Sequence, residues 1–216
     1  MFMLALITGA SSGIGRDMAR ILSERGYDLI LVARRKTRLS QLKKELKTNV
    51  EIINLDISSV YNCTELYDQV KDKNIDIVIN NAGFGLYGEF TSLKLEKELD
   101  MIDTNIKAVH CLTKLFLEDF KKKDKGYILN VASSAAFMPG PMMATYYATK
   151  AYVLHFTEAI YEELRQSGSH VYIGALCPGP VNTNFNKVAG VEFSLNALTS
   201  YDVAHYALEQ MFRRKL

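Results

Sequence analysis

The chain has 216 residues, of which 48% are hydrophobic, and this suits one α/β domain, residues 1–216, with a continuous core. Its 26 basic and 24 acidic residues leave a net charge of +2, so no overall field favours nucleic acid or an anionic membrane. No run reaches the roughly 18 apolar residues of a membrane helix. The first glycine motif also begins too close to Met1 for a signal peptide to precede it. We therefore expect a cytoplasmic protein that binds neither nucleic acid nor a membrane.

Apolar stretches alternate with amphipathic ones in a β-α-β-α order, which predicts a parallel sheet with helices on both faces. The predicted strands cover residues 4–7, 29–32, 51–55, 75–79, 127–131 and 171–176. The predicted helices cover residues 16–25, 36–47, 61–71, 95–122, 146–166 and 201–213. The three cysteines, Cys63, Cys111 and Cys177, lie far apart without metal-ligand spacing, so we expect neither a metal site nor a disulfide.

The first predicted strand ends in a glycine-rich segment with the sequence TGASSGIG. Glycines let the backbone approach a pyrophosphate closely, and the helix that follows offers free N–H groups and the positive end of its dipole. The segment therefore predicts a dinucleotide site, formed by Gly9, Ser11, Ser12, Gly13, Ile14 and Gly15. Its G-x-x-x-G-x-G spacing differs from the G-x-G-x-x-G spacing of other dinucleotide-binding proteins.

The second predicted strand ends in Ala33-Arg34-Arg35, where an NAD-binding protein would carry an acidic residue for the ribose 2′-hydroxyl. A carboxylate there would repel a 2′-phosphate, whereas a guanidinium binds it with two hydrogen bonds. The pair therefore favours NADP over NAD, with Arg34 placed ahead of Arg35. The alternative is that both arginines only point into solvent at the end of a strand.

Tyr146 and Lys150 are four residues apart, so a helix places them on one face beside a common ligand. A nearby fixed cation favours a phenolate, and Lys150 is expected to lower the tyrosine pKa from its ordinary value of about 10. The hydroxyl of Ser133 follows the fifth predicted strand, at the carboxyl edge of the sheet where ligands bind in open α/β folds. The three residues predict a proton-transfer site, although Ser134 and Tyr147 are neighbouring alternatives.

Five motifs, in their order and at their distances, resemble the short-chain dehydrogenase/reductase family: TGASSGIG, Asn80-Asn81-Ala82-Gly83, Ser133, Tyr146-x-x-x-Lys150 and Pro178-Gly179. The resemblance covers residues 3 to 212 and implies a Rossmann-type, doubly wound parallel sheet in three layers. The thirteen-residue offset from Tyr146 selects Ser133 over Ser134. Members of the family usually continue into a seventh strand, but the last predicted helix ends close to Leu216, so six strands are expected here, with weaker pocket closure or dimer contacts.

The resemblance also implies roles for residues that spacing alone would not single out. Asp56 matches the aspartate that accepts from the adenine amino group, with capping of the next turn as its alternative. Asn81, Ala82 and Gly83 match residues that lie against the adenine ribose, although an Asn-Ala-Gly turn could simply end the strand. Asn105 matches the helix asparagine that binds a water in the proton path to Lys150.

The segment after the sixth predicted strand is expected to meet the nicotinamide and the substrate. By resemblance, Pro178, Gly179 and Val181 approach the carboxamide, and Thr183 reaches a cofactor phosphate or amide. Residues 184–198 match the variable substrate lid of the family. Apolar side chains in this lid and after the fifth strand predict an apolar pocket, or alternatively a subunit interface. They are Val188, Val191, Phe193 and Leu195, with Phe137, Met138, Met142 and Met143.

The function expected from the resemblance is hydride transfer between NADP(H) and a carbonyl or alcohol, with an apolar ketone, aldehyde or 3-oxoacyl group as substrate. Its four catalytic residues would be Ser133, Tyr146, Lys150 and Asn105. The family also implies a homodimer or homotetramer. The alternative is a regulatory or scaffolding protein that binds NADP without turnover, while the short chain argues against a sugar-nucleotide epimerase or dehydratase.

Overall fold

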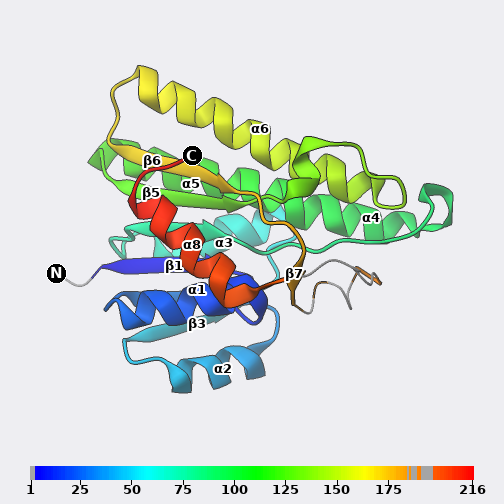
Figure 1. Ribbon diagram of the computed structural model, residues 1–216. Helices are drawn as coiled ribbons and strands as arrows, with labels where there is room; N and C mark the ends of the chain where they lie inside the picture. Colours follow the sequence, from blue (N-terminus) through cyan, green and yellow to red (C-terminus); the bar gives the residue numbers. More distant parts are fainter. Residues whose placement is uncertain (1–2, 184, 186–188, 191–196) are drawn as a thin grey trace.

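A six-stranded parallel sheet forms the centre of the molecule in the computed structural model, which describes residues 3–183, 185, 189–190 and 197–216. The strand order is β3-β2-β1-β4-β5-β6. Its strands are β1 (Leu4–Thr8), β2 (Asp28–Ala33), β3 (Val50–Asn54), β4 (Ile77–Asn80), β5 (Gly126–Val131) and β6 (Val171–Leu176). Figure 1 shows the helices packed around these strands. The expected doubly wound, three-layer α/β fold with six strands is confirmed.

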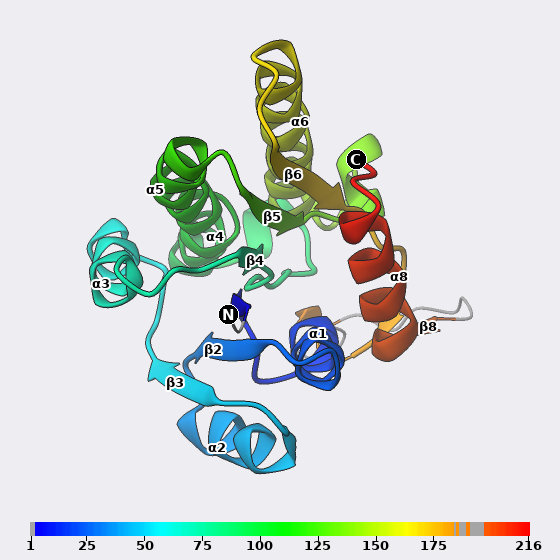
Figure 2. The same ribbon diagram turned by 90° about the vertical axis from the view of Figure 1, so that its left-hand side faces the viewer.

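Helices cover both faces of the sheet, as Figure 2 shows in a view turned by 90°. One layer holds α1 (Gly13–Glu24), α2 (Lys36–Glu45) and α8 (Ser200–Phe212). The other layer holds α3 (Val60–Val70), α5 (Ala108–Lys123) and α6 (Ala144–Gln166). Side chains alternate between the faces of a strand, so Ala5 and Ile7 of β1 pack in the first layer and Leu6 in the second. The sheet is thus apolar on both faces, as a buried parallel sheet requires.

The long helical pattern over residues 95–122 is divided in the structure. α4 (Leu95–Ile102) runs into a π-helical turn, Asp103–Lys107, before α5 begins. The turn is closed by a hydrogen bond from the Ala108 N–H to the Asp103 carbonyl, one residue wider than in an α-helix. Such turns are rare and occur often at functional sites. The spacing of apolar residues cannot reveal this π-helical turn, because one extra residue rotates the apolar face of the helix by only part of a turn.

A second, two-stranded sheet was not expected from the sequence. β7 (Val181–Asn182) pairs with β8 (Leu198–Thr199), and β8 leads directly into α8. Of the expected lid, only residues 185, 189–190 and 197–198 lie within the described part; Val188, Val191, Phe193 and Leu195 lie outside it. No helix in the described part is long and apolar enough to span a membrane.

The order in which strands are added to the sheet reverses between β1 and β4, and this determines where a ligand can bind. β1 pairs with β2 on one side and with β4 on the other, so the connections after β1 and β4 lead to opposite faces. In open α/β sheets such a switch point leaves a crevice at the carboxyl ends of the strands. The segment after β1 is the glycine-rich loop, and the segment after β4 begins with Asn81. Both therefore meet at this crevice.

Candidate active site

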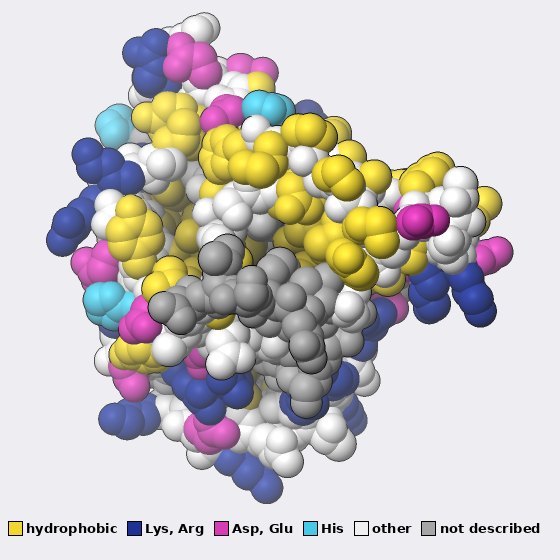
Figure 3. All heavy atoms as spheres, turned by 45° about the vertical axis from the view of Figure 1, so that its right-hand side comes forward, with side chains coloured by type: hydrophobic (Ala, Val, Ile, Leu, Met, Phe, Trp, Pro, Cys, Tyr) yellow, Lys and Arg dark blue, Asp and Glu magenta, His cyan; other side chains and the backbone are white. Residues whose placement is uncertain are grey.

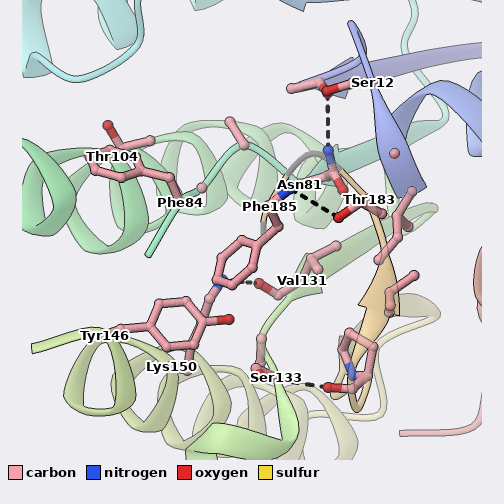
Figure 4. Close-up of a pocket in the computed structure, with 18 of the residues that line it drawn as sticks. Ser12, Asn81, Phe84, Thr104, Val131, Ser133, Tyr146, Lys150, Thr183 and Phe185 are labelled. Atoms are coloured by element: carbon pink, nitrogen blue, oxygen red, sulfur yellow. Dashed lines mark hydrogen bonds between the residues drawn. The ribbon is translucent and has the colours of Figure 1, made fainter. Parts of the chain in front are cut away.

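A cavity of about 420 Å³ lies at the carboxyl edge of the sheet and joins segments from across the chain. The glycine-rich loop and the two arginines after β2 line one end, and Ser133, Tyr146 and Lys150 line the other. Figure 4 shows Ser12 of the loop on the far side of the cavity from Ser133 and Tyr146. Of the catalytic and cofactor-binding residues expected from the sequence, all but Gly15 and Asn105 line this cavity. The described residues contain no cluster of histidine, cysteine, aspartate or glutamate that could hold a metal ion.

Two glycines of the loop leave room for the side chain of Asn81, the first residue after β4. Asn81 Nδ2 donates to the carbonyls of Thr8 and Gly9, at 3.0 and 3.3 Å, and so joins the ends of β1 and β4. A Cβ on Gly9 or Gly15 would lie 2.8 or 2.3 Å from that same nitrogen. Both glycines are required for this packing, and Gly9 also lines the cavity, so the expected approach of their backbone to a pyrophosphate stays a prediction. Asn81 both ends the strand and lines the cavity.

The start of α1 remains suited to an anion. Ser12 is its N-cap but makes no side-chain cap hydrogen bond, and the first turn carries no acidic residue. The N–H groups of this turn and the positive end of the helix dipole can therefore bind phosphate oxygens. Gly13, with φ +57°, lies beside Thr183, since a Cβ there would be 3.1 Å from Thr183 Cγ2. The loop and the segment after β7 thus enclose one narrow space.

The two arginines after β2 have different partners. Arg35 is bound to the loop: its Nη2 donates to Ser11 Oγ at 2.9 Å and to Ser12 Oγ at 2.8 Å. Burial and the neighbouring guanidinium groups of Arg38 and Arg34 lower the pKa of Arg35. Arg34 is 67% exposed and has a single long ion pair, 3.5 Å to Asp56 Oδ2. The guanidinium groups of Arg34 and Arg35 both line the cavity and make this end of it cationic.

Asp56 has local partners that match neither expected role fully. Its Oδ1 accepts from the Ser58 N–H at 3.1 Å, within a turn that precedes α3. The N-cap of α3 is Ser59, whose side chain accepts from the Asn62 N–H. The Asp56 carboxylate also lines the cavity beside Arg34. It therefore shapes the turn and faces a ligand at the same time.

Ser133 and Tyr146 bring two hydroxyl groups together at the other end. Ser133 Oγ accepts from the Ala135 N–H at 3.1 Å and donates to the Pro178 carbonyl at 3.4 Å. Burial raises the pKa of Tyr146 to about 12, while a hydrogen bond with Ser133 acts in the opposite direction. The phenol therefore stays protonated at neutral pH. Ser134 is exposed and also lines the cavity.

Lys150 lies against the Tyr146 ring on the same helix, but the Tyr146 pKa differs from the expectation. Its Nζ donates to the Val131 carbonyl at 2.8 Å and lies 5.8 Å from the centre of the Tyr146 ring. Burial lowers the pKa of Lys150 to about 8. Burial of the phenol raises the Tyr146 pKa, so the net lowering expected beside this cation does not appear. Lys150 is one turn from Tyr146 on α6, as the spacing predicted.

Asn105 is fully buried in the π-helical turn, and its side chain has a structural task. Its Oδ1 accepts from the Phe84 N–H at 3.1 Å, and its Nδ2 donates to the Phe84 carbonyl and to Thr149 Oγ1. This side chain thus joins the loop after β4 to α6. A Cβ on Gly83 would lie 3.0 Å from Asn105 Oδ1 and 3.5 Å from Lys150 Nζ, so Gly83 separates the two groups.

Several lining residues were missed by the sequence interpretation. Phe84, Tyr147, Met143 and Phe185 surround the substrate end with apolar surface, and Thr104 lines it as well. Met143 was expected there, Phe185 falls within the expected substrate lid, and Tyr147 was named as an alternative to Tyr146, whereas Phe84 and Thr104 were not singled out. Phe84 could have been found from its place directly after the Asn-Ala-Gly turn.

Three apolar residues named from the sequence do not line the cavity. Phe137, Met138 and Met142 are exposed to 64%, 61% and 36%. Figure 3 shows hydrophobic side chains gathered on one face of the molecule. The expectation of a pocket made by the segment after β5 therefore holds for Met143 alone.

A doubly wound parallel sheet with a glycine-rich loop at its switch point and a Ser-Tyr-Lys set at the same edge defines a nucleotide-binding oxidoreductase class. Comparison with known proteins makes this specific. The model of the short chain dehydrogenase family matches residues 3–191. The chain belongs to this family.

Relatives and solved structures agree with this assignment. An uncharacterized oxidoreductase of Staphylococcus epidermidis is 34% identical over 96% of this chain and 91% of its own. The human very-long-chain 3-oxoacyl-CoA reductase is 31% identical over 85% of this chain and 61% of its own length. A short-chain dehydrogenase from Sphingobium yanoikuyae, solved in complex with NADPH, is 33% identical with a TM-score of 0.92, covering 100% of this chain and 86% of that one.

Proposed function

We propose that this oxidoreductase uses NADPH to reduce a carbonyl group on an apolar substrate to an alcohol. The observation that carries the proposal is the pairing of the Ser133 and Tyr146 hydroxyl groups, next to buried Lys150, in a cavity that continues to a cationic glycine-rich loop. One end suits the phosphates of a dinucleotide, and the other suits a carbonyl oxygen.

The described residues fit NADP at each part of the cavity. The uncapped start of α1 and the exposed Arg34 would hold the pyrophosphate and the 2′-phosphate. A Cβ on Gly179 would meet no protein atom within 4 Å, so a ligand can approach the backbone there. The carbonyl of the neighbouring Pro178 accepts a hydrogen bond from Ser133 Oγ. The NADPH in the Sphingobium protein supports the same choice. NAD is the less favoured cofactor, because no acidic residue ends β2.

When bound, NADPH supplies the hydride that attacks the carbonyl carbon. The substrate oxygen then needs one proton, and Tyr146 is placed to donate it because its phenol is protonated at neutral pH. Ser133 donates a hydrogen bond to the same oxygen and holds it at the phenol. Carbonyl, hydride and proton together make the alcohol, and the tyrosinate regains a proton from solvent.

Lys150 assists by its charge. It is protonated below a pKa of about 8, and a cation beneath the ring stabilises the tyrosinate that forms when the proton leaves. Asn105 would hold the loop after β4 against α6, and this would keep Gly83 close to Lys150. We place Asn105 as a positioning residue, since its side-chain amide is already bonded to protein groups.

The substrate is proposed to be a ketone, an aldehyde or a 3-oxoacyl thioester with an apolar substituent. The walls near Tyr146 are Phe84, Met143, Tyr147 and Phe185. These side chains offer dispersion contacts and no charge to a substituent. The activity in the name of the human relative, 3-oxoacyl-CoA reduction, belongs to the same chemical class.

The test is consumption of reduced nicotinamide by the purified protein. NADPH and NADH are each supplied with a panel of aromatic aldehydes, ketones and 3-oxoacyl thioesters, and absorbance of the reduced cofactor is followed. We expect turnover with NADPH and a loss of at least 100-fold in Tyr146→Phe, the scale of general acid catalysis. Tyr206→Phe removes a phenolic hydroxyl at an exposed position outside the cavity, so it is the matched control and should retain activity. Tight NADPH binding without turnover on the whole panel would instead favour the regulatory alternative.

A further inference from the structure

The ring of Phe185 covers the catalytic phenol. Its centre lies 5.2 Å from the centre of the Tyr146 ring, with 51° between the two planes, so the rings pack in a tilted pair. Figure 4 shows the Phe185 ring above Tyr146 and Lys150, pointing into the cavity. Tyr146 is only 8% exposed, while Phe185 is partly exposed. Phe185 therefore forms a layer between the phenol and the cavity opening.

Gly85 makes room for this ring. Gly85 is buried, and a Cβ there would lie 2.7 Å from Phe185 Cζ, 3.2 Å from Met143 Cε and 3.2 Å from Tyr146 Cδ2. A contact of 2.7 Å is too short for two carbon atoms, so any side chain at this position would displace the ring. The sequence places glycine where the two aromatic rings and Met143 converge.

The backbone of Phe185 is held at the cofactor end of the cavity. The Phe185 N–H donates to Thr183 Oγ1 at 3.2 Å, and Thr183 in turn lies against Gly13 of the glycine-rich loop. The ring is thus anchored close to one end of the cavity and reaches toward the other. Its surroundings are apolar, with Met101, Ala135, Met143 and Ala189 buried in the same cluster.

We propose that Phe185, seated over Gly85, is a specificity-determining residue that selects carbonyl compounds with a planar aromatic substituent. This rests on the function proposed above. A substrate whose oxygen meets Ser133 and Tyr146 must lay a substituent along the exposed face of the Phe185 ring or displace that ring. An aromatic substituent stacks on the Phe185 ring and so replaces the contacts that this ring loses when it is displaced. A small alkyl substituent leaves the Phe185 ring poorly packed.

The first arm of the test measures specificity. For acetophenone and 2-butanone, the ratio of kcat/KM values should fall by about five- to tenfold in Phe185→Ala, the size of one aromatic pair. Phe185→Leu keeps most of the volume without the ring and should lower the ratio as well. Phe137→Ala removes an aromatic side chain that is 64% exposed outside the cavity and should leave the ratio unchanged. An unchanged ratio in both Phe185 variants would overturn the proposal.

The second arm needs no turnover, because the chain contains no tryptophan and F185W is a single reporter. Its emission should be blue-shifted relative to F137W and quenched by acetophenone at lower concentrations than F137W. Adding G85A to F185W should shift the emission to the red. Quenching without NADPH consumption would refute the proposed reduction but retain the aromatic site. Consumption with equal quenching of both reporters would refute the site and retain the reduction.

Discussion

Lys150 donates a 2.8 Å hydrogen bond from Nζ to the main-chain carbonyl of Val131, the last residue of β5. This bond ties the helix that carries Tyr146 to the strand that leads into Ser133. The lysine is fully buried at this point, and no carboxylate faces it among the groups that shift its pKa. The site therefore maintains a cation by position and not by an ion pair.

The buried Lys150 should make stability depend on pH in the alkaline range. Burial lowers its pKa from 10.5 to about 8, so between these values the unfolded chain binds more protons than the folded one. The contribution of Lys150 to the free energy of unfolding therefore increases as pH rises from about 8 to about 10, by up to ~1.4 kcal/mol per pH unit. Urea unfolding at several pH values should show this slope in the difference between wild type and Lys150→Met. A flat difference would contradict it.

Gly15 and Gly179 should respond differently to alanine. A Cβ on Gly15 would lie 2.3 Å from Asn81 Nδ2, whereas a Cβ on Gly179 would meet no protein atom within 4 Å. Gly15→Ala should lower the stability by about 1–3 kcal/mol through overpacking. Gly179→Ala should leave the melting temperature unchanged but weaken NADPH binding, since only a ligand would occupy that space. Thermal melts and fluorescence titration with NADPH measure the two effects separately.

Arg34 should contribute more to NADPH preference than Arg35. The guanidinium of Arg34 is exposed, with one long ion pair, and can bind a 2′-phosphate at little cost. Arg35 must give up hydrogen bonds to Ser11 and Ser12 to do the same. Arg34→Ala should therefore raise the NADPH dissociation constant about tenfold or more, as loss of a charge-assisted hydrogen bond implies. NADH binding is the control, and it should change little.

A larger effect on NADPH in Arg35→Ala than in Arg34→Ala would contradict this order. Each variant is titrated with both cofactors at one salt concentration, because exposed charges are screened by salt.

The buried Thr157 of α6 should contribute more to stability than Thr64, its exposed counterpart in α3. Thr157 Oγ1 donates to the Val153 carbonyl at 2.7 Å and accepts from Asn130 Nδ2 at 3.0 Å in the core. Thr64 makes the same bond to Val60 at the surface. Thr157→Val leaves the buried Asn130 amide without this partner and should cost about 1–3 kcal/mol.

Thr64→Val should cost less than ~0.5 kcal/mol, because water can replace the lost contact. Urea denaturation of both variants gives the comparison. Equal losses would show that the buried amide finds another partner.

The sequence by itself determined the helices and strands of the sheet and the types of side chain at the two ends of the cavity. Apolar periodicity predicted six strands in a parallel sheet, and the four-residue spacing of Tyr146 and Lys150 placed both on one helix face, because these patterns depend only on neighbouring residues. The glycine-rich loop and the arginines after β2 indicated a phosphate site for the same reason. Local geometry is sufficient for such inferences.

Tertiary structure decided what those residues contact. Gly15 is matched to Asn81, Gly85 to Phe185, and Asn105 to Phe84, and each pair depends on how β1, β4 and the segments after them meet. The direction of the Tyr146 pKa shift also came only from burial, which opposed the effect expected of a nearby lysine. Desolvation and close packing depend on the whole surroundings of a side chain, and spacing along the chain does not contain that information.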